Sequence, residues 1–120
     1  MALTRALRQE FGPGYSIEGA LSAEEAFAII DGLEGRDVEL KVVVSDLLMP
    51  GLRGDDFLRA VARTRPAVKC ILLTGMPGSE EEDRLRRDIG LVASLPKPCN
   101  NSQLAQAVRD ALAAPSLRAR

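Results

Sequence analysis

Apolar and polar positions alternate along the chain with two different periods, which together predict five helices and four strands. Helical spacing of apolar residues marks the segments Leu3 to Phe11, Ser22 to Gly35, Gly54 to Arg65, Ser79 to Gly90, and Asn100 or Asn101 to Pro115. Short β-branched or alternating runs predict strands at Tyr15–Glu18, Val42–Asp46, Val68–Thr74 and Leu91–Leu95. The regular alternation of helices and strands predicts an α/β domain, in which helices cover both faces of a parallel sheet.

The three consecutive valines from Val42 to Val44 predict a strand that is buried on both faces, as strands of parallel sheets are. This strand leads into Asp46 and then into a turn at Pro50-Gly51. Ligands of open α/β sheets bind at the carboxyl ends of the strands, because the loops there leave a crevice. Asp46 is therefore a candidate site residue, although the position also suits an ordinary strand-end aspartate.

Two further predicted strands lead into polar side chains. Thr74 ends the strand that begins at Val68, and Lys97 stands between two prolines just after Leu95. All carboxyl ends of a parallel sheet lie at one edge, so a carboxylate, a hydroxyl and an ammonium group can converge there. Each residue alone also has a purely structural interpretation. Their order and spacing favour a shared site.

The chain resembles the receiver domains of two-component response regulators over nearly its whole length. The matching segments are Val44 to Gly51 with Gly54, Ile71 to Gly75, and Leu95 to Pro98. Asp46 and Thr74 are 28 positions apart, and Thr74 and Lys97 are 23 positions apart, which are the separations found in that family. Each motif alone is weak or moderately specific, but together and in this order they are a strong match.

This resemblance implies a flavodoxin-like, doubly wound fold and a signalling role as a phosphoacceptor, not as an enzyme. Asp46 would accept a phosphoryl group from a phosphohistidine on a histidine kinase or a histidine phosphotransfer protein. Lys97 would supply a positive charge, and the Thr74 hydroxyl would bond a phosphoryl oxygen. Asp46 and the Leu48 carbonyl would bind Mg²⁺. The alanine-rich last helix also resembles receivers at the end of hybrid sensor kinases.

The chain departs from the family pattern in two places. Receivers begin with a strand that ends in an acidic pair about 45 positions before the acceptor, which falls at or before Met1, and no segment here supplies it. Because Mg²⁺ usually takes one or two carboxylates, we expect it to bind weakly. Asp55 and Asp56 are better explained as first-turn residues of a helix. An aromatic residue common in receivers is replaced by Ser94.

The missing strand would be central in the sheet, between the strands at Tyr15–Glu18 and Val42–Asp46. We therefore expect four strands. Either the chain is a fragment of a longer domain, or the Tyr15–Glu18 strand shifts to pair with the Val42–Asp46 strand, or another molecule covers the exposed edge. A homodimer would cover it.

Length and composition predict a single domain at residues 1–114 followed by a tail or linker at 115–120. The formal net charge is −1 and only 3% of residues are aromatic, so a nucleic-acid surface is not expected. No apolar run is long enough to span a membrane, and the expected location is the cytoplasm. Cys70 and Cys99 are expected to be reduced thiols, and histidine is absent.

Other functions were weighed against the phosphoacceptor. A degenerate receiver that binds a protein partner without phosphorylation fits the missing acidic pair and Ser94. A hydrolase with an aspartate nucleophile commonly needs a second aspartate two positions later, where this chain has Leu48. The acidic cluster at Glu80, Glu81 and Glu82 is expected to be a solvated helix cap.

Overall fold

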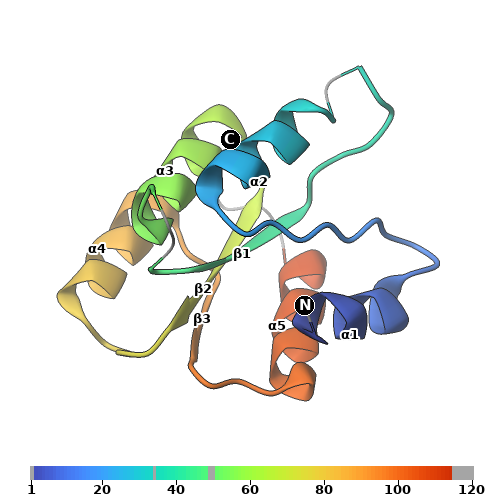
Figure 1. The fold of residues 1–120 in the computed structure, drawn as a ribbon. Coiled ribbons are helices and arrows are strands. Elements are labelled where there is room, and N and C mark those ends of the chain that lie inside the picture. The colour runs from blue at the N-terminus through green and yellow to red at the C-terminus, as the bar shows by residue number, and fades with distance from the viewer. Residues whose placement is uncertain (1, 34, 49–50, 115–120) are drawn as a thin grey trace.

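The computed structural model describes residues 2–33, 35–48 and 51–114 (Figure 1). The elements are α1 (Ala2–Phe11), α2 (Ala23–Asp31), β1 (Val42–Asp46), α3 (Gly54–Thr64), β2 (Lys69–Thr74), α4 (Glu80–Ile89), β3 (Ala93–Pro96) and α5 (Asn101–Ala113). All five predicted helices and three of the four predicted strands are thus confirmed. The predicted tail at 115–120 and the turn residue Pro50 lie outside the described residues.

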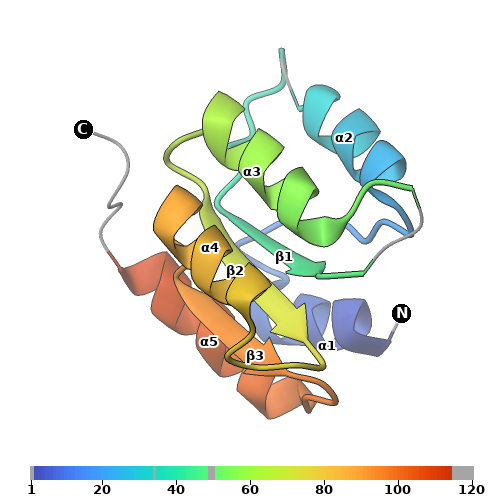
Figure 2. The same cartoon turned by 90° about the vertical axis from the view of Figure 1, so that its left-hand side faces the viewer.

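The three strands are parallel and lie in the order β1-β2-β3. Helices α2, α3 and α4 cover one face of this sheet, and α1 and α5 cover the other (Figures 1 and 2). None of the helices in the described part of the chain is long and apolar enough to cross a membrane.

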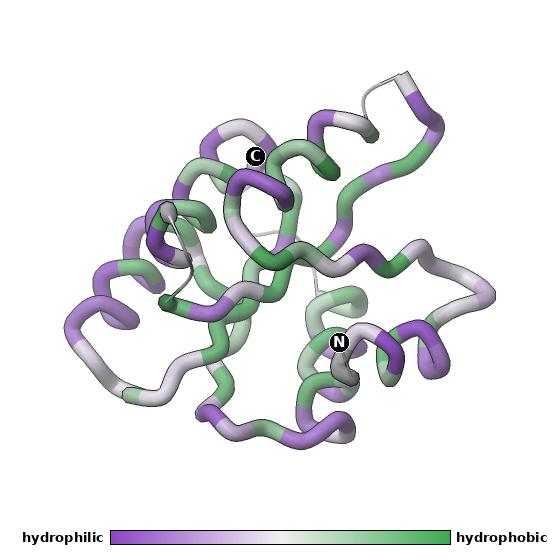
Figure 3. Tube along the Cα trace, viewed as in Figure 1, coloured by the Kyte–Doolittle hydropathy of each residue, from purple (hydrophilic) through white to green (hydrophobic). Residues whose placement is uncertain are grey.

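Each face of the sheet has its own apolar core. On the first face, Leu58 and Val61 of α3 and Leu85 of α4 pack with Cys70 and Leu72 of β2. On the second face, α5 packs on the alternate residues of β2, and Leu7 and Phe11 of α1 pack at the margin. Figure 3 shows the strands as largely hydrophobic and the outer turns of α4 as hydrophilic. The alternation along β2 therefore serves two cores, as expected for a strand with helices on both sides.

The predicted strand at Tyr15–Glu18 is wrong, because these residues form no strand in the structure. The Arg8 guanidinium of α1 instead donates two hydrogen bonds to the Ile17 carbonyl, at 3.1 and 2.9 Å. A strand here needs a neighbouring strand to satisfy its backbone groups, and no described segment lies paired between it and β1. The side chain of Arg8 takes over part of that role.

The prediction that β1 is buried on both faces is confirmed only in part, because Val43 packs against one core and Val42 and Val44 against the other, but incompletely. Val42, Val43 and Val44 are only partly buried. Within the described residues β1 has a strand neighbour on one side only, β2. The Lys41 carbonyl accepts a hydrogen bond from the Lys69 N–H group, and the Leu47 N–H group donates to the Leu73 carbonyl. Backbone groups alternate in direction along a strand, so the odd-numbered residues bond to β2 and the even-numbered residues face the open edge.

The helix ends follow the predicted capping chemistry with one exception. The Ser22, Ser79 and Asn100 side chains each accept a hydrogen bond from the backbone N–H group three residues later. The predicted end of the second helix at Gly35 is wrong, because α2 ends at Asp31 and is capped by Gly32. Gly35 lies in the following turn with a positive φ of 81°, a backbone conformation that suits glycine.

Gly54, the first residue of α3, holds that helix against the end of β1. Its N–H group donates to the Leu47 carbonyl at 2.8 Å. A Cβ atom on Gly54 would lie 1.7 Å from the Asp46 carbonyl oxygen, so a side chain would force β1 and α3 apart. The close approach therefore requires glycine at this position.

We expect the substitution Gly54→Ala to lower the free energy of unfolding by about 1–3 kcal/mol or more, because the added methyl group overlaps backbone atoms. Gly14→Ala is the control, since no atom lies within 4 Å of its would-be Cβ atom. Urea unfolding monitored by circular dichroism measures both variants. Equal stability of the two would contradict the close approach at Gly54.

Candidate functional site

The ends of the three strands bring two of the predicted site residues into direct contact. Asp46 is the last residue of β1, and Lys97 follows Pro96, the last residue of β3. The Lys97 Nζ atom lies 3.4 Å from the Asp46 Oδ1 atom. Both side chains are partly exposed, at 46% and 40%, so the pair is accessible from solvent. An approaching anion can therefore reach the lysine and an approaching electrophile can reach the carboxylate.

Thr74 lies between these two residues in the sheet, at the end of the central strand β2. Its position in the register is opposite Pro96, next to Lys97, and its side chain is 1% exposed. The Thr74 carbonyl accepts a hydrogen bond from the Lys97 N–H group at 2.8 Å. The hydroxyl oxygen accepts one from the Met76 N–H group at 3.0 Å. The hydroxyl hydrogen is the group that remains to donate to a ligand.

The loops beyond the strand ends carry exposed apolar side chains. Leu48 is 71% exposed and Met76 is 72% exposed. Neither side chain has a polar group that could orient a water molecule. The residues Met49 and Pro50, which belong to the motif after Asp46, lie outside the described residues.

The described residues fit a magnesium ion poorly. They contain no group of three or more His, Cys, Asp or Glu side chains that could hold a metal ion. Near the strand ends the available donors are the Asp46 carboxylate, which already contacts Lys97, and the Leu48 carbonyl. Asp55 and Asp56 do not add to them, because both carboxylates pair with arginine side chains. No step of the chemistry below is therefore assigned to the ion.

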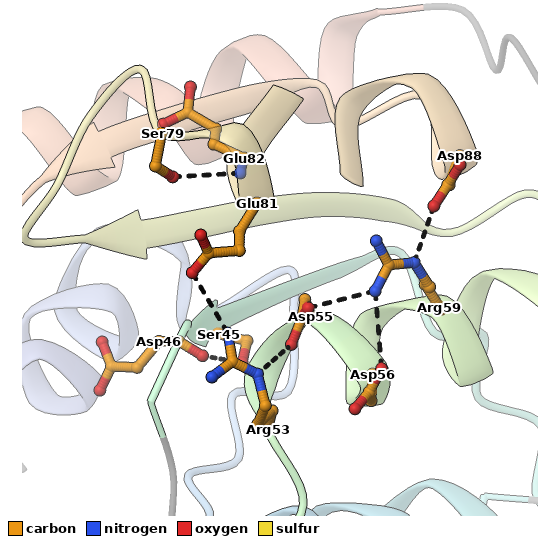
Figure 4. A network of polar contacts seen from close by, with 10 residues as sticks. All are labelled: Ser45, Asp46, Arg53, Asp55, Asp56, Arg59, Ser79, Glu81, Glu82 and Asp88. Atoms are coloured by element: carbon orange, nitrogen blue, oxygen red, sulfur yellow. Dashed lines mark hydrogen bonds and ion pairs between the residues drawn. The ribbon is translucent and has the colours of Figure 1, made fainter. Parts of the chain in front are cut away.

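A network of arginine and carboxylate side chains, which the sequence pattern did not predict, joins Arg53 and α3 to α4 (Figure 4). Arg53 contacts Asp55 at 3.1 Å and Glu81 at 3.5 Å, and Arg59 contacts Asp55 at 3.2 Å and Asp88 at 2.9 Å. Burial raises the pKa of the Asp55 carboxyl, but hydrogen bonds from Arg53 and Arg59 outweigh this effect, and its pKa lies below the ordinary value. Asp55 thus stays ionised between two arginines.

Comparison with known proteins identifies the family. The sequence model of the response regulator receiver domain matches residues 1–109. The chain belongs to this family. The sensor kinase CckA of Brucella abortus is 36% identical over 102 residues, which are 82% of this chain and 10% of the kinase. The uncharacterized transcriptional regulatory protein YesN of Bacillus subtilis is 31% identical over 72 residues, 60% of this chain and 19% of that protein. The receiver domain therefore spans a small part of the length of these relatives.

Solved structures show the same fold. A CheY-like receiver domain from Methanospirillum hungatei JF-1 has a TM-score of 0.75 at 26% identity, covering 92% of this chain and 82% of that one. The receiver domain of NtrX from Brucella abortus has a TM-score of 0.74 at 21% identity, with 92% and 87% covered, and supports the fold alone. The flavodoxin-like, doubly wound fold predicted from the sequence is confirmed, with three strands in the described residues instead of four.

One residue of this receiver domain differs from what the sequence predicted. Glu82, expected to be solvated with the rest of its acidic cluster, is 7% exposed. Its carboxylate accepts hydrogen bonds from the Gly78 N–H group at 3.1 Å, from Arg86 at 3.1 Å and from the Ser94 side chain. Burial raises the pKa of the Glu82 carboxyl, but these hydrogen bonds outweigh this effect and lower its pKa. Glu82 therefore ties the loop after β2 to β3 and α4.

We expect Glu82→Gln to lower the free energy of unfolding by about 1–3 kcal/mol at neutral pH, because charge-assisted hydrogen bonds to a buried group are lost. The lowered pKa stabilises the folded state above the ordinary value of 4.5, and this contribution is lost as the pH falls through the folded pKa. The difference between wild type and variant should therefore shrink below pH 4.5.

Urea unfolding at a series of pH values measures this difference. Glu80→Gln is the matched control, because that side chain is 88% exposed and should leave stability nearly unchanged. A difference for Glu82→Gln that does not change with pH would contradict the role of its charge.

Proposed function

We propose that Asp46 is the phosphoacceptor of this receiver domain and that Lys97 and Thr74 bind the transferred group. The contact of 3.4 Å between the Lys97 ammonium and the Asp46 carboxylate is the observation that carries this proposal. A lysine held at this point can neutralise charge that builds up on the phosphoryl oxygens during transfer. Thr74, next in the sheet, can donate its hydroxyl hydrogen to one of those oxygens.

The reaction follows from these positions. An Asp46 carboxylate oxygen forms a bond to phosphorus as the N–P bond of a donor phosphohistidine breaks. The electron pair of that bond stays on the imidazole nitrogen, which takes a proton from solvent. Because the receiver domain contains no histidine, the phosphohistidine belongs to another domain or protein, a histidine kinase or a histidine phosphotransfer protein.

The magnesium ion that receiver domains generally bind is proposed to bind weakly here, through Asp46 and the Leu48 carbonyl. The support is the small donor set at the strand ends.

We propose that residues 1–114 are the receiver domain and that 115–120 continue as a tail or linker, as in the receiver of a hybrid sensor kinase. The similarity to the sensor kinase CckA supports this arrangement. The cytoplasm is the proposed location. The balanced charge offers no support for nucleic-acid binding.

We expect a phosphorylated histidine kinase or acetyl phosphate to label the wild-type protein, and Asp46→Asn to abolish the label. Lys97→Ala should slow labelling by roughly 10²-fold, the cost of removing one charge-stabilising group from a transfer site. Lys41→Ala is the matched control, because Lys41 pairs with Glu39 away from the site. Thr74→Ala should have a smaller effect than Lys97→Ala.

The label is measured by intact-mass spectrometry and by its acid-stable, base-labile character. An unlabelled wild type would contradict the phosphoacceptor proposal and favour the degenerate receiver that binds its partner without phosphorylation. Labelling that persists in Asp46→Asn would place the acceptor elsewhere.

We further propose that the open edge of β1 is covered in a homodimer. The support is the partly buried run of three valines and the backbone groups of Val42 and Val44, which face that edge. An apolar strand with an unpaired edge readily takes up another strand.

Light scattering at high micromolar concentration should give twice the 12.9 kDa of one chain. Hydrogen exchange at the Val42 and Val44 amides should slow as the concentration rises, while Val43, which bonds toward β2, serves as the control. A monomer at high micromolar concentration would refute the homodimer.

A further inference from the structure

Two segments of the chain carry the groups proposed to bind the phosphoryl oxygens: the β2–α4 loop (residues 75–79) and β3. Thr74 ends β2 just before the loop, and Lys97 directly follows β3. The Lys97 N–H group donates to the Thr74 carbonyl at 2.8 Å, and the Thr74 hydroxyl oxygen accepts from the Met76 N–H group of the loop at 3.0 Å. The relative position of the hydroxyl and the ammonium group therefore depends on where the loop and β3 lie.

The Glu82 carboxylate of α4 is bonded to both of these segments. It accepts a hydrogen bond from the Gly78 N–H group of the loop at 3.1 Å and another from the Ser94 hydroxyl of β3. Ser94 pairs with Leu72 in the register of the sheet, and Leu72 belongs to the core beneath α4. The Ser94 side chain therefore lies on the face of the sheet that α4 covers. Figure 4 shows the Glu82 carboxylate directed away from that of Glu81.

These contacts close a ring that contains both of the proposed phosphoryl-binding residues. From Thr74 the chain runs four residues to Gly78, which is joined to Ser94 through the Glu82 carboxylate. From Ser94 it runs three residues to Lys97, whose N–H group bonds back to Thr74. The glutamate is the side-chain link of this ring. Its loss would open the ring and let the loop and β3 shift independently.

The burial of Glu82 favours a role in positioning over a role in stability alone. The residue is 7% exposed, and burying a carboxylate costs free energy that its hydrogen bonds must offset. An apolar side chain would fill the same space without this cost. The two carboxylate oxygens accept hydrogen bonds from defined directions, so they fix the places of the groups that donate to them. The third donor, Arg86 at 3.1 Å, lies one turn further along α4 itself.

We propose that Glu82 is a positioning residue that holds Thr74 and Lys97 in the relative position that phosphoryl transfer requires. It acts through its donors on the loop and on β3, and it does not itself touch the transferred group. No covalent bond forms or breaks at Glu82. This inference rests on the proposed function of Asp46 as the phosphoacceptor.

Native-state hydrogen exchange measures the ring without any phosphoryl transfer. In Glu82→Gln, the amides of Met76 and Lys97 should exchange about tenfold faster relative to control amides, because charge-assisted hydrogen bonds to the loop and β3 are lost. The control amides are those of Lys69 and Val92, which bond to neighbouring strands at the other end of the sheet. A general loss of stability would speed the exchange of all four amides by the same factor.

Arg86→Gln is the matched control variant. It removes a hydrogen bond from the same carboxylate but leaves the loop and β3 bonded to it, so exchange at Met76 and Lys97 should match the wild type relative to the control amides. Should Glu82→Gln fail to fold, Ser94→Ala removes the link to β3 alone. That variant should speed exchange at Lys97 more than at Met76.

Positioning also predicts a change in the transfer step. With acetyl phosphate as the donor, Glu82→Gln should lower the maximal rate of Asp46 labelling by about tenfold, because misplaced groups lose contacts that are made in the transition state. The acetyl phosphate concentration that gives half of the maximal rate should stay nearly unchanged. Arg86→Gln should be labelled at the wild-type rate.

Two failures are distinguishable. If the wild type is labelled on Asp46 but Glu82→Gln speeds exchange at Met76 and Lys97 no more than at the control amides, Glu82 does not position the site and the acceptor proposal stands. If the wild type is not labelled, the acceptor proposal falls, and the positioning role falls with it whatever the exchange rates.

Discussion

The parallel register of three strands is the constraint on which the site depends. Because β1, β2 and β3 run in the same direction, their carboxyl ends open at one edge, and three loops carry their side chains into the same space. The register sets Asp46 against Leu73 and Thr74 against Pro96. A shift of one residue in any strand would turn its last side chain to the opposite face and separate Asp46 from Lys97. The two apolar cores of the sheet resist such a shift.

Charge is the second organising feature of this edge. Asp46 contacts Lys97, Asp55 lies between Arg53 and Arg59, and Glu82 is held by Arg86 and by backbone and serine donors. Buried carboxylates of this kind persist only when donors compensate for the loss of water, as the lowered pKa values of Asp55 and Glu82 indicate. Asp46 is paired with Lys97 at the strand ends, and the other ion pairs join residues on and before α3 and α4.

The open edge of β1 is related to the small number of metal-binding groups at the described strand ends. Both follow from the lack of a described strand beside Val42–Asp46, because such a strand would cover the valines and could place further side chains near Asp46. The hydrogen bonds from Arg8 to Ile17 show how the chain compensates locally for a missing strand partner. The valines of β1 remain only partly buried.

Local patterns in the sequence were sufficient for the helices, the three paired strands, and the placement of Asp46, Thr74 and Lys97 at strand ends. Periodicity, capping residues and turn residues act over a few positions, so they can be read without coordinates. The predicted strand at Tyr15–Glu18 failed because strand formation also requires a partner, which is not a local property.

The tertiary structure alone decided the environment of the charged groups. The sequence places Glu80 and Glu82 in the same first helical turn, yet Glu82 is buried against Ser94 and Glu80 is almost fully exposed. Likewise the local sequence marks Asp55 only as a first-turn residue of a helix, and the fold buries it between Arg53 and Arg59. Burial and ion pairing depend on which distant segments pack together, and that packing is set by the whole fold.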